Sequence, residues 1–295
     1  MTAPAHLLPE TAALLSLSPR QRCLSMRQQK FVPYPAGMAA LRWLRYHYDF
    51  EAGRDRPQSL HLMGAPGIGK SRVLTHYAAL HAVSEADRDS DGHLQRPVVL
   101  LEMPSSGDFR AFCNELMATC IPGFRAQTAA TYLQRVGPAL RQCGVKQLLI
   151  DEAGNLLNGG KHAQQHCLSL LKSVTNQGIT VCIATTENMR AVLAADDQLL
   201  SRFTRVVLPE WTESQDLRQF LLGIEAQLPL PEPSNLARME IVRWLMARGL
   251  TVTSPLLKLL REAATLAIVA GEPCITLARL EQAAAGELPP DLGLA

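Results

Sequence analysis

The stretch Leu60-His-Leu-Met-Gly64-Ala-Pro-Gly-Ile-Gly-Lys70-Ser71 decides the fold of this chain. It joins an apolar run to a helical pattern through the spacing G-x-x-x-x-G-K-[ST], which is typical of a phosphate-binding loop. Glycines let backbone N–H groups curl around phosphates, and the start of the next helix favours negative charge. We expect Lys70 to reach the β- and γ-phosphates of a nucleotide and Ser71 to hold magnesium. The alternative is an ordinary glycine-rich turn.

The predicted nucleotide-binding residues are those of the loop and the one that follows it. They are Gly64, Ala65, Pro66, Gly67, Ile68, Gly69, Lys70, Ser71 and Arg72. Lys70 is also expected to take part in catalysis, because its charge would lie against the phosphate that is transferred. The expected cofactors are ATP and Mg²⁺.

A pair of carboxylates defines the second informative segment, Gln147-Leu-Leu-Ile-Asp151-Glu152, in which Asp151 lies 81 residues after Lys70. Asp151 at the end of an apolar strand is expected to orient magnesium, and Glu152 to polarise the water that attacks the γ-phosphate. A glutamate at this place favours hydrolysis over transfer to a metabolite. The alternative is an exposed acidic pair at a strand end.

Five short apolar runs alternate with helical patterns along the first two thirds of the chain. The runs are 60–63, 98–103, 148–150, 179–184 and 206–208, and the helices are expected at 70–83, 108–120, 128–143, 162–176 and 214–228. This alternation predicts an α/β fold, with a buried parallel sheet covered by helices.

The segment Leu-Pro-Leu-Pro-Glu-Pro-Ser-Asn-Leu, residues 228–236, contains three prolines, which stop a helix and exclude a central strand. Helical patterns follow it at 237–248, 254–270 and 277–285, with no strand signal. We therefore expect an N-terminal extension at 1–30, a nucleotide-binding α/β domain at 31–230, a small helical domain at 231–286 and a disordered tail at 287–295.

Composition narrows the class of protein. Of the 295 residues, 47% are hydrophobic and 19% are charged, which indicates a globular chain. No apolar run reaches the roughly 18 residues of a membrane span, and the first twenty residues lack the pattern of a secretory peptide. We expect a cytoplasmic protein without membrane contact. Its seven widely spaced cysteines are expected to be reduced.

The net charge of +2 does not by itself indicate a polyanionic partner. Between Arg20 and Arg56, however, eight basic residues stand against three acidic ones. This basic segment is either a solvated helical face or a surface that docks a partner.

Polar residues after the later strands extend the predicted site. Thr186, which follows Thr185 at the end of the fourth apolar run, is expected to place a hydroxyl near the γ-phosphate, and Glu187 and Asn188 form a further polar cluster. A helix N-cap by Thr186 is the alternative.

Two arginines precede or begin the last strand. Arg202 or Arg205 can project to the γ-phosphate of a neighbouring subunit, because a guanidinium offers the transition state a positive charge and a bidentate fork of donors. This reading implies a homo-oligomer. Surface salt bridges are the alternative for each arginine.

These elements together resemble the AAA+ ATPases over residues 31–285. The segments KFVPYPAGMAAL, LPEWTESQDLRQFL, LPLPEPSNLA and SPLLKLLREAATLAI resemble more closely the TniB/TnsC family of transposition regulators. The resemblance implies a P-loop AAA+ fold with a five-stranded parallel sheet and a small all-helical lid. It also implies assembly with ATP on double-stranded DNA, without sequence preference, as a hexamer-like ring or helical filament. A transposase of the TniA/TnsB type and a TniQ-type adaptor are the implied partners.

The resemblance also assigns further residues. It places Phe31, Val32 and Tyr34 against the adenine, with a hydrophobic N-terminal staple as the alternative. Lys258 stands in the lid helix where the family carries a sensor arginine, although no clear G-x-x-R occurs here. The family contacts DNA through the region after the second strand, where the candidates here are Arg110, Arg125, Ser105, Ser106 and Thr128.

The implied function is an ATP-dependent, DNA-binding transposition regulator that links target selection to transposase recruitment. Its ATPase activity would be regulatory, with hydrolysis driving disassembly. Two alternatives share the nucleotide chemistry. One is another AAA+ helper or loader, either IstB-like or initiator-like, and the other is a nucleotide-gated protein scaffold with little hydrolysis.

Overall fold

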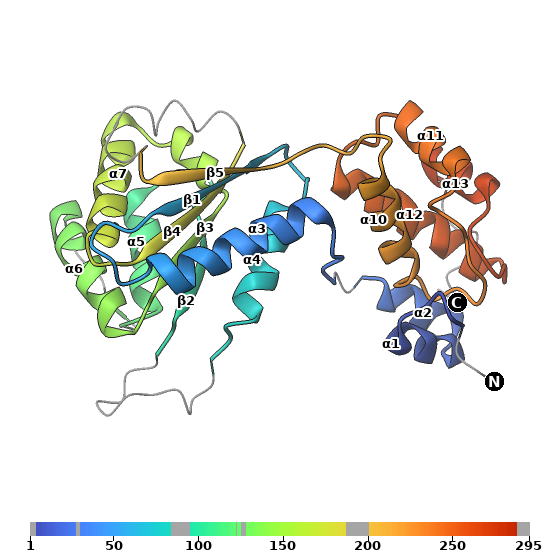
Figure 1. The fold of residues 1–295 in the computed structure, drawn as a ribbon, viewed down its shortest axis with the longest axis horizontal. Coiled ribbons are helices and arrows are strands. Elements are labelled where there is room, and N and C mark those ends of the chain that lie inside the picture. The colour runs from blue at the N-terminus through green and yellow to red at the C-terminus, as the bar shows by residue number, and fades with distance from the viewer. Residues whose placement is uncertain are drawn as a thin grey trace. The chain divides into compact units, whose positions relative to one another are not determined.

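The computed structural model of the protein describes residues 4–27, 30–83, 95–121, 123–124, 128–186 and 201–287. The chain forms two compact units (Figure 1). One unit, which we call the sheet unit, is Ala36–Pro209. The other, the helical unit, combines Met1–Pro35 with Glu210–Ala295.

The sheet unit is built on five parallel strands in the order β2-β3-β4-β1-β5. The strands are β1 (Ser59–Gly64), β2 (Val98–Glu102), β3 (Gln147–Asp151), β4 (Thr180–Thr185) and β5 (Phe203–Leu208). Every residue of β1 and β4 is buried, as expected for central strands covered on both faces. The predicted α/β class and five-stranded parallel sheet are confirmed.

Helices cover both faces of this sheet (Figure 1). The sheet unit contains α3 (Pro35–Tyr46), a π-helical turn η2 (His47–Glu51), α4 (Lys70–Ala79), α5 (Phe109–Ala118), α6 (Ala129–Gln142), a 3-10 turn η3 (Ala153–Asn158) and α7 (Lys161–Thr175). A cluster of buried hydrophobic side chains joins α5, α6 and α7 to one face of the sheet, with members such as Phe112, Tyr132 and Leu148. On the other face, Tyr77 Oη of α4 donates to the carbonyl of Leu44 in α3.

The predicted helices of this unit all exist. Three of them, α4, α5 and α6, are two to four residues shorter than expected, and α7 has the expected length but begins and ends one residue earlier. Capping explains two of the starts: the side chains of Asp108 and Thr128 accept hydrogen bonds from the backbone N–H groups of Ala111 and Thr131. The two residues therefore lie outside the helices that they cap, although the sequence places them inside.

The helical unit contains both ends of the described chain. Its elements are α1 (Pro9–Ala13), a 3-10 turn η1 (Leu14–Ser16), α2 (Pro19–Ser25), α10 (Gln215–Glu225), α11 (Met239–Ala247), α12 (Thr253–Val269) and α13 (Leu277–Ala284). The N-terminal segment is tied to the later helices, since the Leu8 N–H donates to Ala226 O at 3.1 Å and Arg22 Nε donates to Pro229 O at 3.0 Å.

The division into units differs from the boundaries expected at residues 30 and 230. Residues 1–35 pack with the C-terminal helices, and α10 belongs to the helical unit. The proline-rich segment is not a linker, because Leu228, Leu230 and Leu236 are buried in this unit. The buried carboxylate of Glu225 accepts hydrogen bonds from the N–H groups of Asn235 and Leu236, at 3.0 and 2.8 Å. Prolines exclude a helix here but do not prevent packing.

Two further expectations concern the whole chain. All seven cysteines are free thiols, and Cys113, Cys143, Cys167 and Cys182 are buried. In the described part of the chain, no helix is long and apolar enough to cross a membrane. Of the expected C-terminal tail, residues 288–295 lie outside the described residues.

Gly223 of α10 tests how tightly residues 31–35 pack within the helical unit. A Cβ added at Gly223 would lie 2.6 Å from Val32 Cγ1. Overpacking costs typically 1–3 kcal/mol, whereas replacing a helical glycine by alanine gains up to about 1 kcal/mol. We predict that Gly223→Ala lowers the free energy of unfolding by about 1 kcal/mol in the wild-type chain and raises it in a Val32→Ala background.

The measurement is urea unfolding of the four proteins of this double-mutant cycle, followed by circular dichroism. If Gly223→Ala has the same sign in both backgrounds, Val32 does not pack on α10.

Candidate nucleotide-binding site

The loop between β1 and α4 has the backbone geometry of a phosphate cradle. Gly67 and Gly69 have φ values of +75° and +115°, which side-chain-bearing residues rarely adopt. At Gly64, where β1 ends, an added Cβ would lie 2.8 Å from Ile68 Cγ2 and 2.9 Å from Leu208 O. The predicted strand-loop-helix context is confirmed, and packing as well as conformation requires its glycines.

Lys70 folds back across this loop. Its ammonium donates hydrogen bonds to Gly64 O at 2.9 Å and to Ala65 O at 3.0 Å. The residue is only 7% exposed, and burial lowers its pKa, while the charges of Glu152 and Asp151 act in the opposite direction. An ammonium has three donors, so one remains for a ligand in the loop.

Asp151 and Glu152 occupy the end of β3, as predicted. The backbone N–H of Glu152 donates to Asp151 Oδ1 at 2.8 Å, which fixes the aspartate side chain. Glu152 has φ 47° and ψ 32°, a left-handed conformation that costs of order 1–3 kcal/mol for a residue with a side chain. Its carbonyl accepts from the N–H of Asn155 at 2.8 Å, and Asn155 Nδ2 donates to Met103 O at 2.9 Å. These bonds hold the strained turn, and strain of this kind is concentrated at functional sites.

The sheet register brings the ends of β3, β4 and β1 together. Ile150 pairs with Ile183, and Met63 pairs with Thr185. The hydroxyl of Thr185 is buried and lies 2.6 Å from His61 Nε2. Thr186 is only partly buried, and its Oγ1 lies 4.0 Å from the Cβ position of Gly154, in the turn that follows Glu152. Of the two threonines, Thr186 therefore has the hydroxyl on the side of the carboxylates. Glu187 and Asn188 lie outside the described residues.

His61 is a site residue that the sequence did not reveal. It stands in the middle of β1, only 2% exposed, and burial, followed by the positive charge of Arg205, lowers its pKa to about 4. A neutral imidazole within β1, the strand that leads into the P-loop, is therefore hydrogen-bonded to the Thr185 hydroxyl. The only sequence signal was one histidine inside an otherwise apolar run.

Arg202 and Arg205 lie away from the loop that follows β1. Arg202 immediately precedes β5, at the amino-terminal edge of the sheet, and its Nη1 donates to Thr175 Oγ1 at 2.8 Å and Asn176 Oδ1 at 3.3 Å. Arg205 is exposed within β5, level with His61. The P-loop lies at the opposite, carboxyl-terminal edge. Their role toward a neighbouring subunit stays a prediction.

The residues assigned to the adenine belong to the helical unit. Val32 and Tyr34 are buried, and the Tyr34 ring packs 5.2 Å from Trp211 and 5.6 Å from Phe220 between ring centroids. Burial raises the pKa of Tyr34 to about 12. These contacts favour the alternative of a hydrophobic staple for Val32 and Tyr34. Phe31 is partly buried, and its ring lies 6.3 Å from that of Tyr34.

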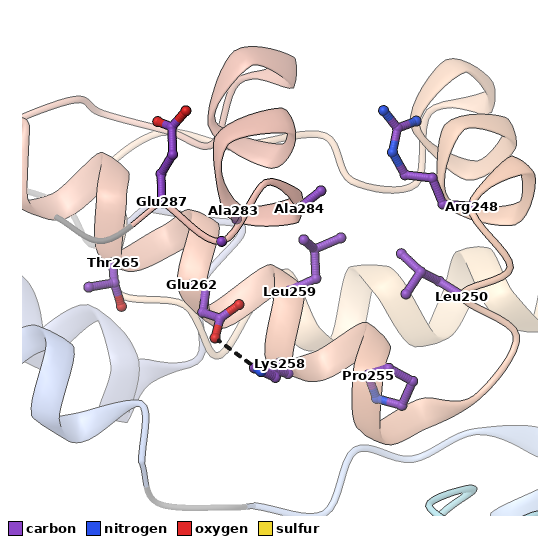
Figure 2. A pocket seen from close by; sticks show the side chains of 11 residues that line it. Arg248, Leu250, Pro255, Lys258, Leu259, Glu262, Thr265, Ala283, Ala284 and Glu287 are labelled. Atoms are coloured by element: carbon purple, nitrogen blue, oxygen red, sulfur yellow. Dashed lines mark ion pairs between the residues drawn. The ribbon is translucent and has the colours of Figure 1, made fainter.

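Lys258 lies in a hollow of about 850 Å³ on the helical unit, between α12, the end of α13 and the turn after α11 (Figure 2). Its ammonium lies 3.8 Å from Glu262 Oε1, one helical turn further along α12. Within the helical unit, the Lys258 ammonium is therefore paired with the carboxylate of Glu262 at the surface. A sensor role stays a prediction.

The candidate DNA contacts are spread over the region after β2. The Ser106 hydroxyl accepts a hydrogen bond from the Asp108 N–H, and Thr128 caps α6. The carbonyl of Ser105 accepts from Asn158 Nδ2 at 2.9 Å. Arg110 is exposed on α5, and Arg125 lies outside the described residues. Arg110 is thus the one cationic side chain of this set whose position is described.

The buried His61 predicts a pH dependence of stability. Its unfolded pKa is about 6.5 and its folded pKa about 4, so the unfolded chain binds a proton between these values that the folded chain does not. The free energy of unfolding should therefore fall by up to about 3 kcal/mol as the pH falls through this window. His61→Gln should remove this part of the dependence, because glutamine can bond Thr185 but does not titrate.

The measurement is urea unfolding between pH 4.5 and 7.5, with His162→Gln as a control at an exposed histidine of α7. Equal pH slopes for the wild-type and His61→Gln proteins would show that His61 is not held neutral.

The chain is similar to one protein family in sequence and to several solved structures in fold. A family model described as "Bacterial TniB protein" matches residues 22–213, and no curated protein matches. The Aeropyrum pernix ORC1 protein, solved in complex with DNA, is 18% identical with a TM-score of 0.65, covering 90% of this chain and 69% of that one. Domain III of the Thermotoga maritima replication initiation protein DnaA is 16% identical with a TM-score of 0.54, covering 88% and 95%.

A third similar structure is the Drosophila ORC bound to DNA, 15% identical with a TM-score of 0.58, covering 97% of this chain and 69% of that one. At these identities the structures establish the fold alone, which is that of the AAA+ ATPases. The family model matches more than half of the residues and includes the P-loop, the Asp151-Glu152 pair and β5. The chain therefore belongs to the TniB family.

Proposed function

We propose that this protein is an ATP-dependent, DNA-binding regulator of transposition. The observation that carries the proposal is the convergence of the P-loop, Asp151, Glu152 and Thr186 at one edge of the sheet, in a chain of the TniB family. This is the arrangement needed to bind a nucleoside triphosphate and to activate water against it.

The residues at this edge fit magnesium and ATP. The glycine cradle has no space for side chains at Gly64, and Lys70 is already placed within the loop. Ser71, in the first turn of α4, and Asp151, with its carboxylate fixed by the Glu152 N–H, would hold the metal. Bound magnesium would neutralise charge on the phosphate oxygens.

Glu152 is the proposed general base. The left-handed turn that begins at Glu152 sets the direction of its side chain independently of the Asp151 carboxylate beside it. The Thr186 hydroxyl would orient the same water or sense the phosphate. Arg202 and Arg205 are the candidates for stabilising negative charge in the site of a neighbouring subunit, which would couple hydrolysis to assembly.

In the proposed cycle, ATP-bound subunits assemble on double-stranded DNA as a ring or a helical filament. The assembly would link a TniQ-type adaptor to a transposase of the TniA/TnsB type, and hydrolysis would disassemble it. Family membership supports this assignment. Contacts to phosphates without base contacts would suit a protein that accepts many target sequences.

A second candidate function is that of an initiator-like DNA loader. The observation in its favour is the structural similarity to the Aeropyrum pernix ORC1 protein in complex with DNA, which extends over 90% of this chain. Both candidates use the same nucleotide chemistry. They differ in whether the DNA-bound assembly recruits a transposase or a helicase, so a pull-down with each purified partner on DNA separates them.

Two substitutions test the assigned roles of the site. Lys70→Ala should abolish ATP binding, because it removes the ammonium that lies across the phosphate-binding loop. Glu152→Gln should retain ATP but slow hydrolysis by at least about 100-fold, as expected for the loss of a general base. The measurements are nucleotide binding by fluorescence and phosphate release. Faster release of ATP and DNA by Glu152→Gln than by the wild-type protein would contradict the assignment.

Electron microscopy tests the assembly. The protein would be imaged with double-stranded DNA and no nucleotide, ADP or a non-hydrolysable ATP analogue, with Lys70→Ala as the control. We expect regular rings or filaments only with DNA and the ATP analogue. Dispersed protein under all conditions would contradict the polymer and favour a scaffold or a partner-dependent ATPase.

A further inference from the structure

The loops that precede the strands concentrate positive charge at the amino-terminal edge of the sheet. In the described segments 52–58, 95–97, 141–146, 176–179 and 201–202, the one acidic residue is Asp55. The basic residues of these segments are Arg54, Arg56, Arg96, Arg141, Lys146 and Arg202. Part of the basic segment noted in the sequence therefore belongs to a larger cationic surface.

A recess of about 420 Å³ lies within this surface, and we call it the basic recess. Its lining includes Arg54, Asp55, Arg141, Lys146 and Asn176. A water molecule occupies about 30 Å³ of liquid volume, so the recess has space for a phosphate group together with bridging water.

The floor of the basic recess is a fixed backbone contact. The Gly53 N–H donates to Gly178 O at 2.7 Å, and a Cβ on Gly178 would lie 3.2 Å from Gly53 Cα. The loop before β1 and the turn before β4 are therefore tied together. The cations of the basic recess therefore surround two backbone segments that are fixed relative to each other.

Two of these cations are not neutralised within the described structure. Arg54 is paired with the buried Glu51 at 2.8 Å. Arg141 and Lys146 form no ion pair with a described residue, and the Lys146 ammonium lies 5.2 Å from the centre of the Tyr48 ring. The helices α6 and α7 end at this edge, but each helix end carries only about half a negative charge. Their dipoles therefore account for only part of the positive charge.

The described loops at the opposite edge of the sheet carry less positive charge. Those that follow β1, β2 and β3, at 65–69, 103–108 and 152–160, contain Asp108 and Glu152 and no lysine or arginine, and the nearest cations, Lys70, Arg110 and Lys161, stand in the first turns of the helices that come next. This is the edge near the DNA contacts implied by the family resemblance, of which Arg110 is the described cation. A polyanion is attracted to the edge where positive charge is concentrated.

We propose that the basic recess binds the phosphodiester backbone of nucleic acid through Arg141 and Lys146, with Arg54 beside them. The inference rests on the proposed DNA binding and gives it a location different from the region after β2. No base-reading contact is required, so recognition is independent of sequence and sensitive to salt.

The test is DNA binding by the Arg141→Gln/Lys146→Gln protein. The control, Arg238→Gln/Arg243→Gln, removes the same charge from exposed residues of the helical unit at and near the start of α11. The Arg110→Gln protein tests the competing location of DNA contact, which is the region after β2. Each protein is titrated against fluorescein-labelled double-stranded DNA with a non-hydrolysable ATP analogue at several NaCl concentrations. Unchanged circular dichroism and thermal unfolding verify folding.

Each phosphate contact contributes about 0.9 to the slope of log K against log salt. The recess variant should therefore lose about 2 from this slope and bind all DNA sequences more weakly, while the control keeps the wild-type slope. A wild-type slope in the recess variant, with a reduced slope in Arg110→Gln, would overturn the location and leave DNA binding intact.

Two other outcomes are also decisive. If the wild-type protein binds no DNA in any nucleotide state, the proposed function fails and the inference with it. If the recess variant binds DNA normally but loses binding to poly-glutamate, the recess docks an acidic protein and the proposal is overturned.

Discussion

The parallel pairing of β3, β4 and β1 is the constraint on which the candidate site depends. Because the three strands run in the same direction, residues that follow them meet at one edge even though Lys70 and Asp151 are far apart in the sequence. The pairing of Met63 with Thr185 places the end of β4 level with the start of the P-loop. Regular strand pairing thus supplies precise positions for a phosphate-binding loop, two carboxylates and a hydroxyl.

Two residues beside the candidate site are held in energetically unfavourable states. Glu152 adopts a left-handed conformation that its neighbours stabilise through hydrogen bonds to Asn155 and Asp151. His61 gives up its charge inside the sheet to bond Thr185. Buried polar groups of this kind are tolerated when they are hydrogen-bonded, and they restrict the core to one arrangement. Both features lie directly beside the residues to which we assign catalysis.

The sheet unit also has a division of charge between its edges. The carboxylates of Asp151 and Glu152 stand at the end of β3, where magnesium and phosphates would be bound, whereas a cluster of arginines and lysines precedes the strands. This division separates the proposed chemistry from the proposed DNA contact at opposite edges of one sheet. It also places Arg202 among the cations of the amino-terminal edge, bonded to Thr175 and Asn176.

The sequence alone determined the P-loop, the acidic pair, the succession of strands and helices along the chain and the α/β class. Each of these depends on neighbouring residues and on periodicity. Tertiary structure decided the rest. The proline-rich segment ends a helix in any context, but only burial of Leu230 and Leu236 shows that it lies inside a unit. Tyr34 has an aromatic ring of the kind that can stack on a nucleotide base, yet the ring packs against Trp211 and Phe220 in a core. Such outcomes depend on residues distant in the sequence, and local patterns carry no information about which distant surfaces will exclude water together.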